Sequence, residues 1–175
     1  MHLIRAVPAD FPAVVELLNR AYRSAPAVAD RAWSTEAGYI DGDRTTIPML
    51  TVDLASNPEA RLMLWRADDG LAGCVWLEPA GADVWYLGML TVRPDLQGGG
   101  AGRRLLEAAE GEARALGARH IRMTVVNVRD GLIAWYERCG YTRTGEILPF
   151  PYDDLRFGAP TRADLSFVVL GRALG

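Results

Sequence analysis

A cluster of glycines near the middle of the chain has the composition of an anion-binding loop. Four glycines lie within residues 97–102, between a run typical of a β-strand and a run typical of an α-helix. Because glycine lacks Cβ, neighbouring backbone N–H groups can converge on one anion, and the next helix adds the partial positive charge of its N-terminus. The alternative is a flexible turn without a ligand, but four glycines directly before a strong helix would then be costly. The loop therefore predicts a pyrophosphate site.

Two familiar nucleotide-binding signatures do not fit this loop. A Walker loop needs a Gly-Lys-Ser/Thr triplet, and none follows the glycines. The dinucleotide fingerprint G-x-G-x-x-G also fails, because Arg103 or Leu105 stands at the third glycine position when the count starts at Gly98 or Gly100. A nucleotide-binding protein of either class is therefore disfavoured.

A second candidate site combines aromatic and acidic side chains. It lies in residues 33–44, within a long loop or broken helix that we expect over residues 24–46. Long ordered loops often carry binding sites. Trp33, Glu36 and Asp41 could together cradle a cation, with simple packing of the aromatic rings as the alternative. We expect a small substrate to bind beneath this segment.

The length and the cysteine content predict a globular domain with its own core. A chain of 175 residues can bury roughly 70% of the surface that its unfolded form exposes, so disulfide or metal staples are not needed. The two cysteines, Cys74 and Cys139, match neither a disulfide framework nor metal-ligand spacing. We expect two reduced core thiols, no metal, and a single domain over residues 1–175.

Charge and hydropathy bear on partners and location. The formal net charge of -3 gives no long-range attraction to nucleic acid and favours a small cationic or neutral ligand. Hydrophobic residues make up 50% of the chain, but no apolar run approaches the roughly 20 residues of a membrane span, and no secretory leader is recognisable. We expect a cytoplasmic protein without nucleic-acid or membrane partners, and the richness in arginine, alanine and glycine suggests a bacterial source.

The spacing of hydrophobic residues predicts alternating helices and strands. Apolar residues three and four apart, such as Val14, Leu18 and Tyr22, indicate amphipathic helices, and short β-branched runs indicate strands. Helices are predicted over residues 10–23, 46–56, 100–116 and 129–139, and strands over 61–67, 71–78, 84–92, 121–126, 142–147 and 165–170. Gly88 inside the third of these strands predicts a bulge or a close backbone approach. This order is typical of a mixed α/β domain without linkers or repeats.

Two motifs together resemble one known family. Gln97-x-x-Gly100-x-Gly102 is similar to the Q/R-x-x-G-x-G/A signature of the GCN5-related N-acetyltransferases, the GNAT family, whose loop amides wrap the pyrophosphate of coenzyme A. Residues 134–141, AWYERCGY, resemble the family's A-x-Y-E-x-x-G-F/Y segment. With the helix-helix-strand opening, the resemblance covers nearly the whole chain. It implies an α/β (α+β) fold with a mixed, mostly antiparallel sheet of about six to seven strands flanked by about four helices.

The resemblance implies a coenzyme A site that includes the glycine loop. Residues 84–92 would form the family's splayed fourth strand, whose bulge directs backbone groups of Leu90 and Val92 at the pantetheine arm and the thioester carbonyl. A backbone N–H there can act as an oxyanion donor. Seven residues before Tyr136 the family often places an asparagine; here Arg129 stands there, and Asn127 is the candidate in its place. The implied coenzyme-binding residues are Leu90, Thr91, Val92, Gln97, Gly98, Gly99, Gly100, Ala101, Gly102, Arg103 and Asn127.

The resemblance also implies catalytic roles. Tyr136 matches the residue that family members use to protonate the leaving thiolate, and a purely structural core tyrosine is the alternative. The family's base is often a glutamate on the fourth strand, but Tyr86 stands at that position, where we expect it to face the acceptor. Glu78, at the end of the preceding strand, is the candidate substitute base, with a solvated turn carboxylate as the alternative.

The implied activity is transfer of an acetyl group from acetyl-coenzyme A to an amine. Acetyl-CoA would be the co-substrate, and the acceptor would be a small-molecule amine, or a peptide as the less favoured option, attacking directly in a ternary complex. The alternative from another class is a non-catalytic acyl-CoA-binding sensor, which the absent glutamate favours and Tyr136 disfavours. A homodimer stays open as the oligomeric state.

Overall fold

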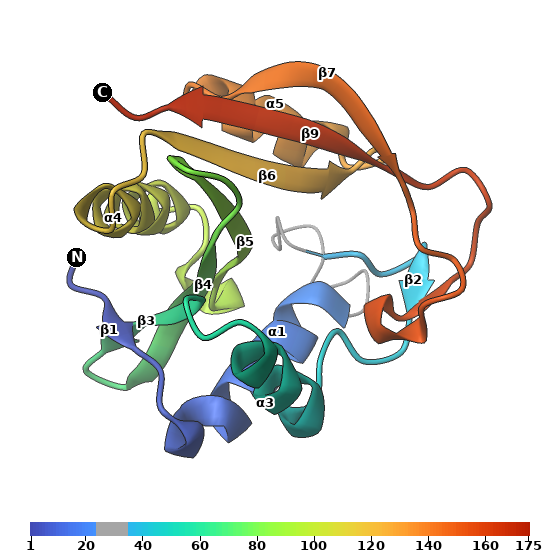
Figure 1. Ribbon diagram of the computed structural model, residues 1–175. Helices are drawn as coiled ribbons and strands as arrows, with labels where there is room; N and C mark the ends of the chain where they lie inside the picture. The colour runs from blue at the N-terminus through green and yellow to red at the C-terminus, as the bar shows by residue number, and fades with distance from the viewer. Residues whose placement is uncertain (24–34) are drawn as a thin grey trace.

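A central sheet organises the chain, whose computed structural model describes residues 1–23 and 35–175 (Figure 1). The strands of the sheet are β1 (Ile4–Arg5), β3 (Arg61–Ala67), β4 (Gly70–Pro79), β5 (Val84–Val92), β6 (His120–Val126), β9 (Ser166–Ala173) and β7 (Thr142–Pro149), in that spatial order. Every neighbouring pair is antiparallel except β5 with β6, which is parallel. The predicted mixed, mostly antiparallel sheet of six to seven strands is confirmed.

Four α-helices flank this sheet in the described part of the chain. They are α1 (Phe11–Arg23), α3 (Ile47–Ser56), α4 (Ala101–Ala115) and α5 (Asp130–Arg138), with single 3-10 turns at Pro8–Asp10, Pro94–Leu96 and Leu155–Phe157. A separate pair of short strands, β2 (Ile40–Asp41) and β8 (Ala159–Pro160), joins the segment after α1 to the loop before β9. None of the described helices has the length and the apolar character that crossing a membrane requires.

The sheet buries a hydrophobic cluster on each face. Along β4, Val75 packs in the cluster that contains Leu105 of α4, and Cys74 packs in the cluster that contains Leu18 of α1. Adjacent strand residues point to opposite faces, so one strand can serve both clusters. Figure 1 shows α1 and α3 together on one side of the sheet and α4 on the other. Successive residues of β4 are therefore buried without alternation, because helices cover both faces of the sheet at this strand.

The helix boundaries lie within one residue of the predicted ones. Helix α3 shows why: the Thr46 hydroxyl accepts a hydrogen bond from the Met49 amide at 3.3 Å, and Pro48 occupies the first turn. Such an N-cap satisfies an amide that the helix itself leaves unpaired. Three two-residue strands, β1, β2 and β8, were not predicted, because two residues carry no periodicity.

Candidate active site

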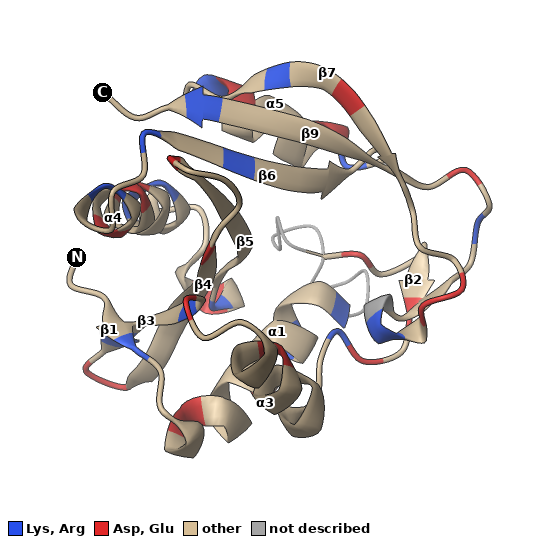
Figure 2. Cartoon of the chain, in the orientation of Figure 1, with Lys and Arg blue, Asp and Glu red and all other residues tan. Residues whose placement is uncertain are grey.

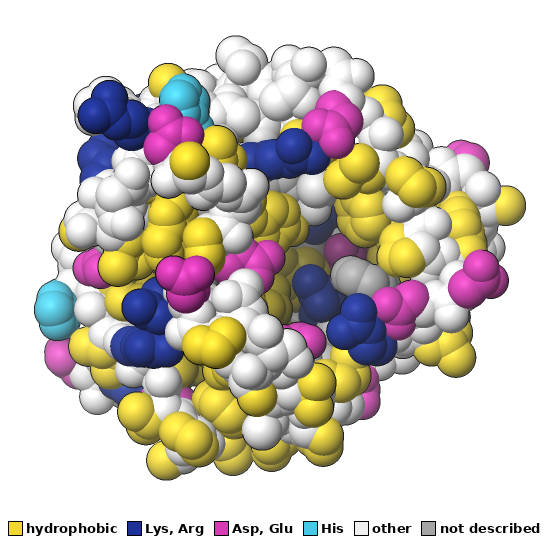
Figure 3. Space-filling model, in the orientation of Figure 1, with side chains coloured by type: hydrophobic (Ala, Val, Ile, Leu, Met, Phe, Trp, Pro, Cys, Tyr) yellow, Lys and Arg dark blue, Asp and Glu magenta, His cyan; other side chains and the backbone are white. Residues whose placement is uncertain are grey.

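A cavity opens where β5 and β6 part. Their ladder joins only three residue pairs, the last being Tyr86 with Arg122, and the strands then diverge (Figure 1). Between them lies a cavity of about 390 Å³ that is lined by β5, β6, the glycine loop, α5 and the segment around Glu36. Figure 3 shows the molecular face hollowed at this point, with hydrophobic and basic side chains in the hollow. The parting of two parallel strands thus creates space for a ligand inside the sheet.

A β-bulge in β5 shapes one wall of the cavity. Met89 and Leu90 together stand opposite Val75 alone, and Met89 has a φ of 49°. The Thr91 hydroxyl holds the bulge by donating to the Met89 carbonyl at 3.0 Å. Because one residue is inserted, the alternation reverses: Leu87 packs toward α4 before the bulge, and Leu90 does so after it. Leu90 and Val92 consequently line the cavity, as the resemblance implies.

Gly88 lies directly before the bulge, and it allows a close approach to its backbone, the second of the two alternatives predicted for it. A Cβ on Gly88 would lie 2.8 Å from Cε1 of Tyr86, so the glycine makes room for that ring. The Tyr86 hydroxyl is 2.9 Å from the Thr124 hydroxyl, across the gap where the backbone ladder has ended. Burial raises the pKa of Tyr86. Tyr86 lines the cavity as a neutral side chain that bridges the two parting strands.

The glycine loop lies at the same cavity and leads into α4. Gly98 and Gly100 have φ values of 90° and 74°, in the left-handed region that favours glycine. Gly100 is the N-cap of α4 and has no side-chain cap, so the first amides of the helix remain available to an anion. The Gln97 side chain ties the loop to β5 by donating to the Val92 carbonyl at 2.8 Å. Five of the predicted loop residues line the cavity, namely Gln97, Gly98, Gly100, Gly102 and Arg103.

Tyr136 projects from α5 into the cavity. Its ring packs edge-on against Trp135 and Tyr141, with centroid distances of 4.8 Å and 5.7 Å, and the residue is buried. Burial raises the pKa of Tyr136, and the Arg129 guanidinium opposes that shift only in part. Within the described part of the chain no hydrogen bond to its hydroxyl is present. Tyr136 is therefore a protonated donor that faces the ligand space.

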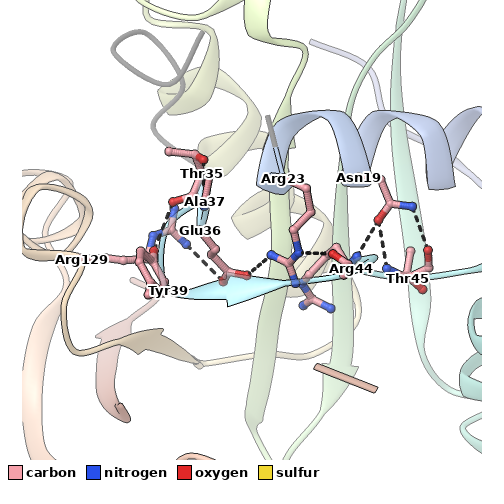
Figure 4. A network of polar contacts seen from close by, with 10 residues as sticks. Asn19, Arg23, Thr35, Glu36, Ala37, Tyr39, Arg44, Thr45 and Arg129 are labelled. Carbon is pink, nitrogen blue, oxygen red and sulfur yellow. Dashed lines mark hydrogen bonds and ion pairs between the residues drawn. The ribbon is translucent and has the colours of Figure 1, made fainter. Parts of the chain in front are cut away.

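The far wall of the cavity is a network of arginines around Glu36 (Figure 4). Glu36 is only 7% exposed, and its carboxylate lies 2.5 Å from Nη1 of Arg23 and 3.8 Å from Nη1 of Arg129. Arg23 also donates to the Gly42 carbonyl at 2.6 Å, and Asn19 accepts from the Arg44 amide at 2.6 Å. These bonds fasten the segment after residue 35 to α1. Glu36 lines the cavity, but its charge is already shared between two arginines.

Several predicted site residues lie away from the cavity lining. Glu78 is half-buried and accepts a hydrogen bond from the Asn57 side chain at 2.8 Å. Asp41 is exposed on β2. Asn127 bonds the Ser166 amide at 3.0 Å and the Asp164 carbonyl at 2.9 Å, which closes the loop before β9. Gly99, Ala101 and the buried Thr91 are not among the lining residues either. Trp33 lies outside the described residues.

Among the cavity residues that received no role from the sequence, Tyr22, Arg129 and Arg44 matter most for the charge of the wall. Tyr22 lies on the apolar stripe of α1 and resembles an ordinary core residue. Arg129 stands where the family's asparagine was expected, and this difference is the only sequence signal that Arg129 belongs to the site. Arg44 belongs to the polar segment singled out above, but its charge opposes the predicted cation cradle. Elsewhere both signs of charge are mixed, as on α4 and β7 in Figure 2. No cluster of three or more potential metal ligands occurs among the described residues.

Comparisons with known proteins agree with this geometry. An IAA acetyltransferase of Azospirillum brasilense is 28% identical over 109 residues, which are 61% of this chain and 71% of that protein. A ribosomal-protein-alanine N-acetyltransferase of Brucella melitensis superimposes with a TM-score of 0.71 at 18% identity, covering 99% of this chain and 100% of the other. A GNAT family acetyltransferase of Elizabethkingia anophelis with acetyl-CoA bound gives a TM-score of 0.58 at 16% identity, over 71% of this chain and 82% of the other.

The sequence model of the acetyltransferase (GNAT) family matches residues 11–141, which include α1, the bulged β5, the glycine loop and Tyr136. That span covers most of the chain and all the elements that form the cavity except β9 and the loop before it. The chain belongs to the acetyltransferase (GNAT) family, and it is an acyltransferase that uses acetyl-CoA.

Proposed function

We propose that this enzyme acetylates the amine of a small molecule, with acetyl-CoA held along β5 and the glycine loop. The observation that carries the proposal is that one cavity brings together the N-terminus of α4, the β5 bulge and the Tyr136 side chain. An acyl donor, an acceptor and a proton donor can therefore meet in one space. The predictions of a single domain, a cytoplasmic location and a homodimer stay predictions.

The loop has the properties that a pyrophosphate requires. A Cβ added to Gly98 or Gly99 would meet nothing within 4 Å, so the space before the loop is open to a ligand. A Cβ on Gly102 would lie 3.5 Å from the Trp135 ring, an ordinary van der Waals contact, so α4 and α5 are packed together here. Arg103 adds a positive charge at the cavity. We infer that the loop amides and Arg103 hold the phosphates.

Bound acetyl-CoA supplies a thioester carbonyl: the amine nitrogen forms a bond to the acetyl carbon, the C–S bond breaks, the amine loses a proton and the sulfur gains one. The Tyr136 hydroxyl would donate a hydrogen bond to the sulfur. Full transfer of its proton is uphill, since a thiol near pKa ~8.5 is the stronger acid and burial raises the pKa of Tyr136 further. The backbone of the bulge at Leu90 would polarise the carbonyl.

The acceptor must lose its proton before it attacks, because an aliphatic ammonium has no lone pair. Glu36 is paired with Arg23 and Arg129, and Glu78 lies off the cavity with Asn57 as its partner. Neither carboxylate is placed to accept that proton directly. We infer that the amine proton leaves to water at the open side of the cavity.

A thermal shift experiment with four ligands tests the proposal. A ligand that binds only the folded state contributes about 2.7 kcal/mol at a hundredfold excess over Kd. For a chain of this size that raises Tm by roughly 5–10 °C. Coenzyme A and acetyl-CoA should give such shifts, and ATP and NAD should give much smaller ones. Equal shifts with all four would contradict a pyrophosphate site specific to coenzyme A.

A thiol-release assay over a panel of amines then tests the reaction. Free coenzyme A should appear only when acetyl-CoA and an accepted amine are both present. Binding of acetyl-CoA without release on any amine would favour the non-catalytic sensor instead.

A further inference from the structure

The charged side chains that line the cavity are mainly basic. Among the described residues three arginines line it, together with the single carboxylate of Glu36. Glu36 is bound to Arg23 on one side and lies 3.8 Å from Arg129 on the other. A cationic acceptor would therefore meet a carboxylate whose charge is already compensated. An anionic group would meet an excess of positive charge.

Of the three described arginines that line the cavity, Arg44 has the guanidinium group that is best oriented to bind an anion. Its guanidinium carbon lies 5.2 Å from the centre of the Tyr22 ring, and its backbone amide is fixed by Asn19. Within the described part of the chain no carboxylate lies within ion-pair distance of Arg44. A guanidinium stacked on an aromatic face keeps its N–H edge available, and that edge matches the two oxygens of a carboxylate or phosphonate.

The Arg44 side chain lines the same cavity as Tyr86 and Tyr136. Burial raises the pKa of Tyr86, and the charge of Arg44 is among the influences that oppose this shift. The Arg129 guanidinium lies 5.9 Å from the same Tyr22 ring. Burial raises the pKa of Tyr136, and the charge of Arg129 opposes this shift. The Tyr22 ring therefore lies close to both arginines, and all three side chains line the cavity.

The same cavity offers an apolar wall beside the arginines. Ile40, Val126, Phe150 and Phe167 line it, and the rings of Phe150 and Phe167 are stacked with centroids 5.4 Å apart. An acceptor that filled the cavity would bury an apolar body against these rings while its polar groups turned toward the arginines.

We propose that the acceptor is an amine that also carries an anionic group, and that Arg44 binds this group. The inference rests on the acetyl transfer proposed above and adds the class of its substrate: an amino acid or aminophosphonate with an apolar side chain. Glu36 then orders Arg23 and Arg129 instead of recruiting the amine. An amino acid of this kind has no net charge at neutral pH, which suits the expectation of a cationic or neutral acceptor.

Four acceptors that share one skeleton test the proposal: phenylalanine, its phosphonate analogue, phenylalanine amide and phenethylamine. Turnover is measured by thiol release at saturating acetyl-CoA, and rates are expressed per neutral amine so that differences in the neutral fraction cancel. At least one anionic acceptor should exceed both uncharged-tail acceptors in kcat/KM by about 10- to 100-fold, the value of one charge-assisted bidentate contact. The better of the two anionic acceptors shows whether the natural group is a carboxylate or a phosphonate.

Variants of Arg44 identify the residue that reads the anion. Arg44→Gln should lower the ratio of kcat/KM for the anionic over the uncharged acceptor by about 10- to 100-fold, and Arg44→Lys should retain part of it. Arg143→Gln is the matched control, because Arg143 is exposed on β7, pairs with Glu137 and lies off the cavity. The Arg143→Gln variant should show the same ratio of kcat/KM for the anionic over the uncharged acceptor as the wild type. A ratio unaffected by Arg44→Gln overturns the proposal.

A binding measurement judges the anion site without turnover. By calorimetry, N-acetylphenylalanine or its phosphonate counterpart should bind the wild-type protein at least about tenfold more tightly than N-acetylphenethylamine, and Arg44→Gln should remove that difference. Equal binding of these ligands to the wild type overturns the anion site. Absence of thiol release on every amine, with the binding difference intact, overturns only the acetyl transfer.

Discussion

The two ends of the cavity are built from different parts of the chain. The donor end consists of backbone: the bulge at Met89, the loop at Gly98 and Gly100, and the first amides of α4. The acceptor end consists of side chains that α1, the segment after residue 35 and the start of α5 bring together, with Glu36 at their centre. A site made of backbone depends on local conformation, whereas a site made of side chains can change its charge with single substitutions.

Gly100→Asp should damage the donor end most severely. The change places a carboxylate at the N-terminus of α4, where phosphate oxygens are expected, and forces a side chain into a φ of 74°. Coenzyme A affinity, measured by calorimetry, should fall by about 100-fold or more, since each charge-assisted hydrogen bond contributes about 1.5–3 kcal/mol.

Two variants separate charge from strain at this position. Gly100→Asn has nearly the same bulk and tolerance of positive φ, so it should lose much less affinity than Gly100→Asp. Gly111→Asp adds a carboxylate to an exposed position of the same helix and should leave binding intact. Normal affinity in a folded Gly100→Asp protein would show that the phosphates bind elsewhere.

Tyr136→Phe should affect the chemistry between the two ends. If the hydroxyl assists sulfur departure, turnover at saturating amine should fall by about 10², the lower end for a positioned acid, because the leaving thiol needs only modest help. Affinity for acetyl-CoA should stay nearly constant, since the ring remains packed against Trp135 and Tyr141.

Tyr141→Phe is the control for the loss of a buried hydroxyl. Tyr141 donates to the buried Glu110 at 2.9 Å and does not line the cavity. The free energy of unfolding should fall by about 1.5–3 kcal/mol, with turnover retained. If Tyr136→Phe behaves in the same way, Tyr136 is structural.

Glu36→Gln tests whether Glu36 at the acceptor end holds two arginines in place or binds a cationic amine. Removing this carboxylate takes away the negative charge that Arg23 and Arg129 share, and their side chains are only 12% and 9% exposed. Removing one member of such a buried ion-pair network lowers the free energy of unfolding by about 3 kcal/mol, which a denaturant titration can measure. Should the variant keep its stability and instead raise KM for cationic amines alone, Glu36 would be a cation cradle after all.

Alkaline pH should lower the free energy of unfolding gradually. Burial raises the pKa of five tyrosines above the unfolded value of about 10: Tyr22, Tyr39, Tyr86, Tyr136 and Tyr141. The unfolded chain therefore loses these protons first, so stability is intact below pH ~10 and declines above it. Each tyrosine contributes at most about 1.4 kcal/mol per pH unit, and Tyr141→Phe should reduce the slope of denaturation free energy against pH by one such share.

The elements with local signals were predictable from the sequence. Helix α3 begins where Thr46 and Pro48 indicate, and α4 follows its apolar spacing. The strands β1 and β2 have no such signal, because pairs such as Ile4 with Leu64 are set by the tertiary fold. The bulge falls at Met89 and Leu90, directly after Gly88, and the space at that glycine is taken by the Tyr86 ring, a contact that the sequence does not indicate.

The same division applies to the site. The glycine loop is contiguous, so its spacing alone indicates an anion site and its motif indicates the coenzyme. Glu36 was singled out for its charge, but its partners Arg23 and Arg129 belong to α1 and to the start of α5, which only the folded chain brings together. The sequence therefore predicted a cation cradle where the structure has an excess of arginine.

The bulge divides β5 into two segments whose alternation is out of phase. Before it, the odd-numbered Leu87 packs toward α4, and after it the even-numbered Leu90 and Val92 do so. Deleting Met89 would leave Leu90 opposite Val75 in a regular strand, with Leu90 and Val92 still on the α4 face, but it would remove the bulge and the extra backbone amide that lines the cavity. The number of residues between Leu87 and Val92 is thus a fixed quantity of the site, so evolution can vary the side chain at Met89 more freely than it can shorten or lengthen the strand.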